Sequence, residues 1–292
     1  MAQFNGQLGW IATAAEDVAY GTLGAALVYQ QGISASLALN ENRVVAPCLG
    51  SVASSPGNRL ATWIGGSITL GHTDEEDDIG VIYDHLASAA GNTYTFGGTP
   101  TNDSLSFFCD FDQIEYDFAG CVIQSITWNL AAGDYSTINL DILGQSVAKY
   151  TGGARSPVLP PCSEIVIPSD LSTFTINGVN TAGCLKGASI TFSWPTTDIG
   201  RQRIGSSTLA QPVRTGRYNV TASFNLELDD ATNADTIDLV DDFIADTQLG
   251  TVVLDNFTIA GCYATGDLPE LSGGPVDFNL NVAGTVLTVY TA

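Results

Sequence analysis

The sequence predicts a mainly β protein with two tandem β-sandwich or barrel domains, each carrying one flanking α-helix. The first observation behind this prediction is an internal repeat. Three short segments occur twice in the same order: 66–70 and 222–226, 119–121 and 260–262, and 138–144 and 278–284. The offsets between the copies stay near ~140 to ~156 residues, which is about one domain length. The second observation is composition. With 31 Gly, few Lys and recurring short runs of Val, Ile, Thr and aromatic residues, the chain is typical of strands joined by many turns.

The first half of the chain is expected to hold an N-terminal arm, 1–30, and a domain, 31–146. Apolar and polar residues alternate at 33–39 and again at 62–70, so both segments are predicted to be strands. Between them lies 40–61, which contains Gly and Pro and is predicted to be a long loop.

A helix is expected after the second strand. Acidic residues at 74–78 precede apolar residues at three- and four-residue spacing, and carboxylates in a first helical turn interact favourably with the helix dipole. Five further strands complete the first domain, near 93–97, 104–110, 113–118, 121–130 and 135–143.

The second half is expected to repeat this plan. A linker rich in Gly and Pro, 147–170, leads into a second domain, 171–292. The predicted elements that open this domain are a strand near 186–194, a long loop at 195–217, a strand at 218–228 and a helix at about 234–246. Shorter strands are expected to close it near 290.

The formal net charge is −22, from 31 acidic against nine basic residues. Such a surface repels nucleic acid phosphate and anionic membranes, so specific binding to either is not expected. A general adaptation to solubility or high salt is the alternative explanation. The opening residues lack the basic and apolar regions of a signal peptide, and no apolar run of ~20 residues predicts a membrane-spanning helix. The chain is therefore expected to fold in a cytoplasm.

Most of the positive charge falls in the two predicted long loops. Six of the nine basic residues lie there and all six are Arg: Arg43, Arg59, Arg201, Arg203, Arg214 and Arg217. Arg makes forked hydrogen bonds to carboxylates and is favoured in interface ion pairs. An acidic body with Arg-bearing loops is self-complementary, so these loops are predicted to contact other copies of the chain. The alternative is that they are surface loops whose Arg residues only improve solubility.

Four acidic residues alternate with apolar ones through a predicted hairpin: Asp110, Asp112, Glu115 and Asp117. They form either the solvated face of an antiparallel strand pair or the lining of a polar space. The acidic run 74–78 lacks the spacing and central Gly of a calcium loop. Common catalytic and nucleotide-binding motifs are absent, so no catalytic residue, cofactor or metal is expected.

Two of the six cysteines occupy equivalent positions in the repeat. Cys121 and Cys262 each follow Ala-Gly. No CxxC or Cys/His spacing accompanies them, so both are predicted to be small buried residues beside a close backbone approach.

These patterns together resemble the tail tube proteins, or major tail proteins, of long non-contractile-tailed bacteriophages, within the group that has two tube domains in one chain. The similar segments are the opening 6–12 with 20–22, the run 66–70 into an acidic helix start, 104–108 through 118–121, and 214–217 before the second acidic strand. The six cysteines and the scarcity of Lys depart from the pattern and leave the loop contacts open.

The resemblance implies tube-type β-sandwich domains, six of which make one ring. A duplicated chain would then form a homotrimer with pseudo-sixfold symmetry, and rings would stack into a hollow tube through which the genome passes. The two long loops and the arm, with Trp10, would reach neighbouring copies. The implied partners are the tail terminator and tail-tip proteins, a tape measure protein in the lumen, and passing DNA without specific binding. Assembly would take place in the host bacterial cytoplasm and the final location would be the virion tail.

A lumen lined with carboxylates would repel DNA phosphate, so the genome could slide without sticking. The candidate residues for such a lumen or its rim are Asp110, Asp112, Glu115, Asp117, Glu227 and Asp229. A neutral or basic inner wall would contradict this hypothesis.

Two other classes of protein are open alternatives. One is a different β-sandwich surface protein, such as a capsid decoration protein or an adhesin or S-layer module. The other is an enzyme such as a β-sandwich glycosidase, because paired carboxylates are abundant. The enzyme would need a cleft with aromatic platforms beside two acids, whereas the four Trp residues are spread along the chain and core packing suits three of them better.

Overall fold

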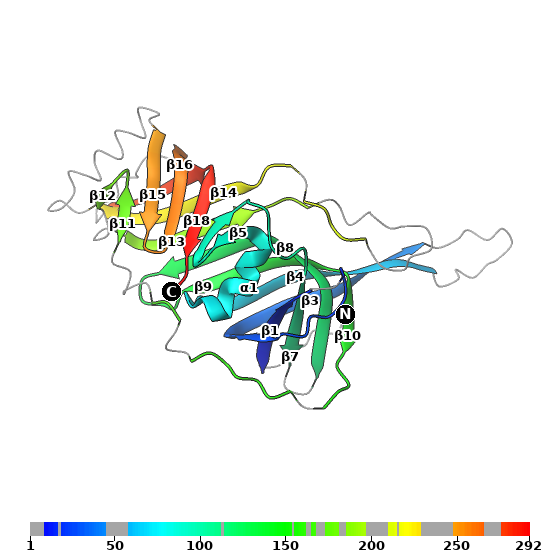
Figure 1. Ribbon diagram of the computed structural model, residues 1–292. Coiled ribbons are helices and arrows are strands. Elements are labelled where there is room, and N and C mark those ends of the chain that lie inside the picture. The colour runs from blue at the N-terminus through cyan, green and yellow to red at the C-terminus, as the bar shows by residue number, and fades with distance from the viewer. Residues whose placement is uncertain are drawn as a thin grey trace.

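The computed structural model is mainly β, with one α-helix among the residues it describes (Figure 1). The described residues are 9–16, 19–44, 58–111, 114–153, 155–161, 165–167, 173–180, 185–196, 210–214, 216–228, 248–265 and 276–292. The elements of the first half are β1 (Trp10–Ala15), β2 (Val28–Gln30), β3 (Gly32–Val44), β4 (Asn58–Gly71), α1 (Glu76–Leu86), β5 (Ala87–Ala90), β6 (Thr93–Phe96), β7 (Leu105–Asp110), β8 (Glu115–Ala131), β9 (Thr137–Gly144) and β10 (Ser146–Lys149). Those of the second half are β11 (Phe174–Ile176), β12 (Val179–Asn180), β13 (Leu185–Ser193), β14 (Asn219–Leu228), β15 (Gln248–Leu254), β16 (Phe257–Thr265), β17 (Val276–Gly284) and β18 (Val286–Tyr290).

The pairing of the strands repeats from the first half to the second. In the first half β1 pairs with β2 and β7, β8 pairs with β7, β9 and β10, and β4 pairs with β3 and β9. In the second half β11 pairs with β12 and β15, β16 pairs with β15, β17 and β18, and β14 pairs with β13 and β17. Each strand of the first set therefore has a counterpart in the second, as the sequence repeat predicted.

One sheet runs through both halves of the chain. Its strand order is β3, β4, β9, β8, β13, β14, β17 and β16, and every neighbouring pair is antiparallel. We call it the continuous sheet. Because its strands pass without interruption from one half to the other, the boundaries 31–146 and 171–292 stay predictions about separate domains.

Two smaller sheets complete the architecture. The first cover sheet consists of β2, β1, β7, the beginning of β8, and β10. The second cover sheet consists of β12, β11, β15, the beginning of β16, and β18, and it gains β6 and β5 from the first half. Figure 1 shows the short strands of both groups lying across the long strands of the continuous sheet. Residues 10–15 and 28–30 of the predicted arm are thus strands of the first cover sheet.

The repeated Ala-Gly-Cys motif lies where a strand changes sheets. The beginning of β8 pairs with β7 and β10, and from Val122 onward the strand pairs with β9. Gly120 has φ +65° and Gly261, its counterpart in β16, has φ +63°. Both values lie in the left-handed region that favours glycine. Such a corner lets one strand contribute to two packed sheets. Cys121 and Cys262 are buried and unpaired directly after it, which confirms their predicted role.

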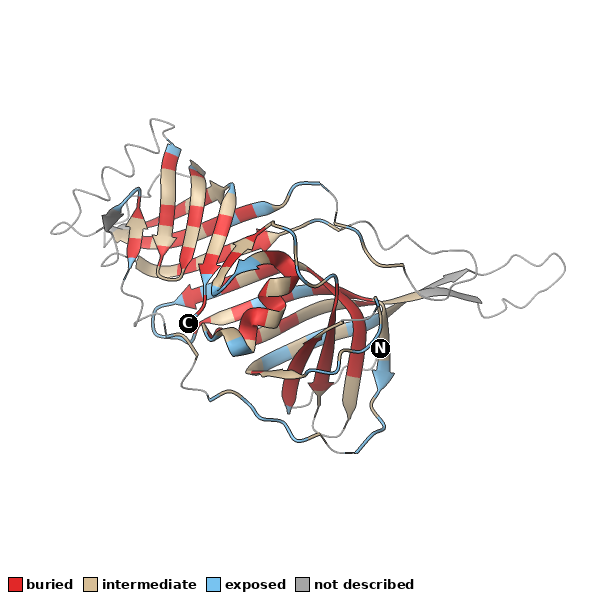
Figure 2. Ribbon diagram, in the orientation of Figure 1, coloured by how far each residue is buried: buried red, intermediate tan, exposed pale blue. Residues whose placement is uncertain are grey.

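Burial alternates along the strands of the continuous sheet, as Figure 2 shows by its red and tan bands. The side chains that point toward the cover sheets and α1 form one apolar core that spans both halves. Its largest fully buried members include Trp128, Tyr83, Phe96, Phe192 and Phe257.

The helix forms where the sequence predicted it. Its first turn holds Glu76, Asp77 and Asp78, which suit the positive end of the helix dipole. Ile79, Ile82 and Leu86 recur at helical spacing and are fully buried, so one face of α1 packs on the core.

Several predicted boundaries differ from the structure. The segments expected at 113–118 and 121–130 are one strand, β8, because the glycine corner bends the chain without ending its pairing. The loop predicted at 40–61 is shorter, since β3 continues to Val44 and β4 begins at Asn58. The helix predicted at 234–246 lies outside the described residues.

Candidate assembly interface

The two halves meet along an antiparallel ladder between β8 and β13. It runs from Ser125 paired with Ser193 to Ala131 paired with Gly187. Side chains add bonds across it: the hydroxyl oxygens of Thr127 and Thr191 lie 2.9 Å apart. Two sheet edges that would otherwise be unpaired satisfy each other here, and an unpaired edge is a template for another strand.

Aromatic side chains from both halves pack behind this ladder. Phe192 of β13 lies 5.2 Å from Phe96 of β6, centroid to centroid, and Trp128 of β8 lies 5.4 Å from Phe257 of β16. The indole N–H of Trp128 donates to the hydroxyl of Tyr83 at 3.0 Å, so its polar atom is satisfied. Edge-to-face pairs of this kind add to the free energy gained by burial.

The hairpin of β5 and β6 fastens the halves a second time. Its strand β6 pairs with β18 through Thr93, Tyr94 and Thr95. Beyond β18, the backbone N–H of Thr291 donates to the carbonyl oxygen of Asn92, at 2.9 Å. The connection that holds this hairpin and α1 spans 72–104, whereas its counterpart in the second half spans only 229–247.

Arg214 crosses from the second half to the end of α1. Its Nη2 donates to the backbone carbonyl oxygen of His85, and its guanidinium carbon lies 4.8 Å from the ring centre of Trp194. A cation is stabilised at the carboxyl end of a helix. Burial lowers the pKa of Arg214 to about 10, so the side chain keeps its charge at neutral pH.

The His85 side chain is enclosed beside this contact. Its Nδ1 lies 2.9 Å from the carbonyl oxygen of Asn102, and its Nε2 accepts from the backbone N–H of Ile123 at 3.1 Å. These partners require a neutral ring with the proton on Nδ1. Burial, followed by the charge of Arg214, lowers the pKa of His85 to about 3.

The same strand position has a neighbour in one half and lacks it in the other. Phe192 of β13 pairs with Val220 as Leu39 of β3 pairs with Ile64. Phe192 is fully buried, because β8 and β6 of the first half cover it. Leu39 is 51% exposed, and the register of β3 in the described residues has β4 as its partner, with no described strand paired along its other edge. The described part of β3 therefore presents an exposed leucine at a position that is buried in β13.

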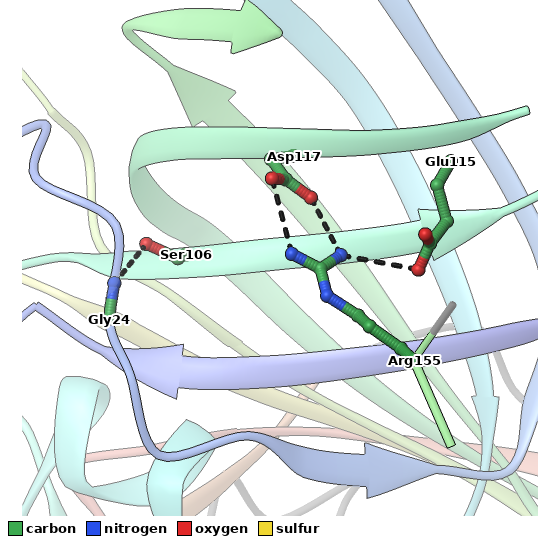
Figure 3. A network of polar contacts seen from close by, with 5 residues as sticks. All are labelled: Gly24, Ser106, Glu115, Asp117 and Arg155. Carbon is green, nitrogen blue, oxygen red and sulfur yellow. Dashed lines mark hydrogen bonds and ion pairs between the residues drawn. The ribbon is translucent and has the colours of Figure 1, made fainter. Parts of the chain in front are cut away.

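The predicted acidic hairpin lies in the first cover sheet and bonds within the chain. Arg155 donates to both carboxylate oxygens of Asp117, at 2.8 and 3.2 Å, and to Glu115 at 3.3 Å (Figure 3). Its guanidinium carbon also lies 3.7 Å from the ring centre of Tyr150 and 4.8 Å from that of Phe108. This network fastens the segment after β10 onto the sheet. Arg155 was not singled out by the sequence, because its partners lie about forty residues away in the chain.

The remaining predicted contact residues are dispersed. Trp10 is buried, with its ring centre 5.3 Å from that of Tyr29, and Arg217 is exposed. Asp110 lies at the end of β7, and Glu227 forms an ion pair with Lys186 at 3.0 Å. Arg43 and Arg59 are register partners on β3 and β4. The other four, Arg201, Arg203, Asp112 and Asp229, lie outside the described residues. Contacts of any of these side chains with other copies stay predictions.

The sequence analysis did not predict the packing of aromatic side chains between the two halves. It also did not predict the β5–β6 hairpin that joins the halves a second time. For the hairpin the sequence did contain one indication, because the connecting segment 72–104 is longer than its counterpart in the second half, 229–247. The junction has no such signal, because alternation shows that Phe192 faces a core but not which half supplies that core.

In the part of the chain that the structure describes, no group of three or more His, Cys, Asp or Glu side chains is placed to hold a metal ion. No helix among these residues has the length and apolar character needed to cross a membrane.

Comparison with known proteins agrees with this architecture. A search of curated proteins finds no match to the chain. The family described as phage tail tube protein matches residues 6–286, nearly the whole chain. The chain therefore belongs to the phage tail tube protein family, whose members are structural proteins of the virion tail.

Proposed function

We propose that copies of this chain join edge to edge into closed rings, and that stacked rings form the hollow tail tube that conducts the genome during ejection. The observation that carries the proposal is the contrast between two equivalent strands. Phe192 on β13 is fully buried by the first half of its own chain, and Leu39 on β3 is 51% exposed. A second copy that supplied the missing neighbour would bury Leu39 in the same way.

The internal ladder indicates which strand supplies that neighbour. Since β16 is the counterpart of β8, the side of one copy that carries β16 would meet β3 of the next, as β8 meets β13 within the chain. The counterparts of the paired residues 125–131 follow Thr265 and lie outside the described residues. The continuous sheet would then pass from copy to copy. Backbone hydrogen bonds of an added strand give affinity and the side chains behind it give specificity.

The size of the ring follows from the resemblance of the sequence to two-domain tube proteins. If six repeats close one ring, three chains are needed and the ring has pseudo-sixfold symmetry. The Arg-bearing loops and the N-terminal segment would contact the next ring. The terminator, tail-tip and tape measure proteins would be the other partners, and assembly would occur in the host cytoplasm.

The test is electron microscopy of purified Leu39→Lys beside the unmodified chain at rising concentration. A lysine at this edge would place a charge in the proposed contact, where an uncompensated buried charge is strongly unfavourable. We expect the unmodified chain to form hollow tubes and Leu39→Lys to remain monomeric. The matched control is Leu159→Lys, because Leu159 is similarly exposed, at 44%, and lies in the segment 155–161, outside β3, the N-terminal segment and the Arg-bearing loops.

Assembly of both variants alike would contradict pairing at β3 while leaving a tube function in place. If the unmodified chain stayed monomeric, the experiment would be repeated with a tail-tip complex as a seed. A chain that stayed monomeric with the seed as well would overturn the proposed function in favour of a decoration or surface module.

A further inference from the structure

Strands β10 and β18 are equivalent strands of the two cover sheets, and they differ in what lies beside them. Lys149 of β10 is the register partner of Tyr116 on β8. At the equivalent place in the second half, Val289 of β18 is the register partner of Phe257 on β16. The other edge of β18 is covered, because β6 of the first half pairs with it through residues 93–95. For β10 the described register gives β8 as the partner, with no described strand along its other edge, and Figure 1 shows β10 on the side away from the second half.

The two strands also differ in the side chain they carry at this place. Val147 and Lys149 alternate with their neighbours and so point to the same side of the sheet, as Leu287 and Val289 do in β18. Val147 packs against the core, and both Leu287 and Val289 are buried. Lys149 is exposed, so a charge stands at the margin of the core where the second half has a valine. A lysine on an edge strand discourages the addition of another apolar strand.

The charge of Lys149 is not compensated by any residue that the structure describes. The other lysine of the chain, Lys186, forms an ion pair with Glu227 at 3.0 Å. Arg155, which lies on the same cover sheet, is held by Asp117 and Glu115. With a net charge of −22, copies of this chain repel one another, so an uncompensated lysine marks a place where an acidic segment of a second copy is attracted.

The internal junction indicates which segment of a second copy would lie there. The strand beside β18, β6, belongs to the connection 72–104, which follows β4 of the first half. Its counterpart in the second half is the connection 229–247, which follows β14. If copies join as the halves join, the connection 229–247 of one copy lies beside β10 of the next. The edges of β3 and β10 would then face the same neighbour, since their counterparts β13 and β18 both pair with the first half.

The sequences of the two connections match the two strands they would meet. The hairpin that reaches β18, residues 87–96, contains no charged residue and lies beside Val289. The connection 229–247 lies outside the described residues, and its sequence contains seven Asp and no Lys or Arg. An uncharged hairpin thus accompanies a valine within the chain, and an acidic segment accompanies a lysine where two copies would meet.

We propose, on the basis of the function proposed above, that the edge of β10 is a docking surface for the acidic connection 229–247 of a neighbouring copy, and that Lys149 determines this specificity. The same place in the fold then joins halves by strand pairing within a chain and by charge attraction between chains. The uncharged β5–β6 hairpin is directed to β18 of its own chain, because at β10 of another copy it would leave Lys149 without a counter-charge. Salt screens attraction between exposed charges, so the contact weakens as ionic strength rises.

Carbodiimide crosslinking of the full chain tests the contact. The reagent joins an amine directly to a carboxylate that touches it, and the chain contains only two Lys. Unlabelled and heavy-nitrogen-labelled chains are mixed before assembly, so mass spectrometry identifies a link between copies by a peptide pair that carries both isotopes. Lys186 and Glu227, 3.0 Å apart within one chain, are the internal positive control.

We expect tubes, but not monomers, to contain links from Lys149 to residues 229–247 of another copy. Tubes that contain the Lys186–Glu227 link and no link between copies from Lys149 to 229–247 would overturn the inference and leave the tube function standing. Absence of tubes for the unmodified chain, with or without a seed, would instead overturn the proposed function.

Charge reversal tests whether the contact matters for assembly. Lys149→Glu should raise the lowest concentration at which tubes form by about tenfold, because it places a carboxylate against an acidic segment. Lys149→Arg keeps the charge and should assemble as the unmodified chain does. The matched control is Lys186→Glu, which changes the net charge equally but lies beside β8 at the internal junction, and whose partly exposed ion pair contributes little to stability. Equal effects of Lys149→Glu and Lys186→Glu would mean that net charge alone is responsible, which would overturn the inference.

Discussion

Strands β3 and β13 occupy the same place in the two halves of the chain, and they differ mainly in what lies beside them. Ile190 and Phe192 of β13 are fully buried, whereas Leu37 of β3 is partly buried and Leu39 is 51% exposed. The backbone pairing behind both strands is equivalent. The comparison teaches that burial here is a property of the junction and not of the strand, because the same position is buried wherever a neighbouring half is present.

The junction between the two halves of one chain also has contacts that a junction between two copies would lack unless other residues supplied them. The hairpin of β5 and β6 pairs with β18, and Arg214 bonds the end of α1. The corresponding connection of the second half, 229–247, is shorter than 72–104. In the ring proposed above, we therefore expect the junction within one chain to be stronger than the junction between copies.

The largest effect should come from breaking the internal junction at Phe192. Phe192→Ala removes a fully buried ring, and substitutions of this kind cost roughly 3–5 kcal/mol of unfolding free energy. Leu39→Ala at the equivalent position should cost about 1 kcal/mol or less, because half of the side chain is already in water. Urea unfolding at a concentration where the chain is monomeric measures both values.

Under conditions that allow assembly, the effects of Phe192→Ala and Leu39→Ala should differ in a second way. Leu39→Ala should weaken tube formation while its monomer remains stable. Equal losses of monomer stability in the two variants would mean that β3 and β13 have equivalent surroundings, which the contrast in burial contradicts.

The second effect concerns two buried histidines at the internal junction. His72 packs against Phe257 of the second half at 5.7 Å between ring centres, and the backbone of His85 accepts the bond from Arg214. Burial lowers the pKa of His72 to about 4 and that of His85 to about 3, from an ordinary value of 6.5. Both rings are therefore neutral in the folded protein at pH 5, where the unfolded chain protonates them.

The unfolded state thus binds more protons below pH 6.5, and stability falls as the pH drops from about 6.5 toward the folded pKa values. Between pH 7 and pH 5 each histidine should cost about 2 kcal/mol of unfolding free energy. Comparing the unfolding profiles of the unmodified chain and His72→Leu isolates the first contribution, since other titrating groups are common to both. Identical pH dependence in the two proteins would contradict a neutral buried His72.

The fold could be predicted from sequence where local patterns determine it. The sequence pattern located β3 and β4 in the first half and β13 and β14 in the second, and acidic residues before a helical apolar pattern located α1. The repeat predicted the equivalence of the strand pairings. The corner at Gly120 was predicted as a close backbone approach beside Cys121, but not as a change of sheet, because strand alternation continues on both sides of it.

The junction between the two halves could not be predicted in the same way. Which edges pair depends on contacts between residues far apart in sequence, such as Ser125 with Ser193. The net charge of −22 suggested a carboxylate-lined passage, yet charge summed over a chain does not say which face carries it. The row of Thr127, Thr191 and Thr221 becomes visible only once the register of three strands is known.

The smallest losses of stability are expected for alanine substitutions at the two glycine corners, Gly120 and Gly261, which occupy equivalent places in the two halves. Alanine in the left-handed region costs about 1–2 kcal/mol before any clash. At Gly120 an added Cβ would lie 2.6 Å from the Cβ of Gln145, whereas at Gly261 it would lie 2.3 Å from the hydroxyl oxygen of Thr285, which can rotate away. Gly120→Ala should therefore destabilise the chain by about 2 kcal/mol and Gly261→Ala by somewhat less.

The matched control is Gly133→Ala. Gly133 also has a positive φ, +84°, but no atom lies within 4 Å of the added Cβ, so only the backbone term of about 1 kcal/mol remains. Thermal or urea unfolding of the three monomeric variants should rank them Gly120, Gly261 and Gly133 in decreasing loss. A loss at Gly120 no greater than at Gly133 would mean that the first corner can relax, so β8 would not need glycine to pass from the cover sheet to the continuous sheet.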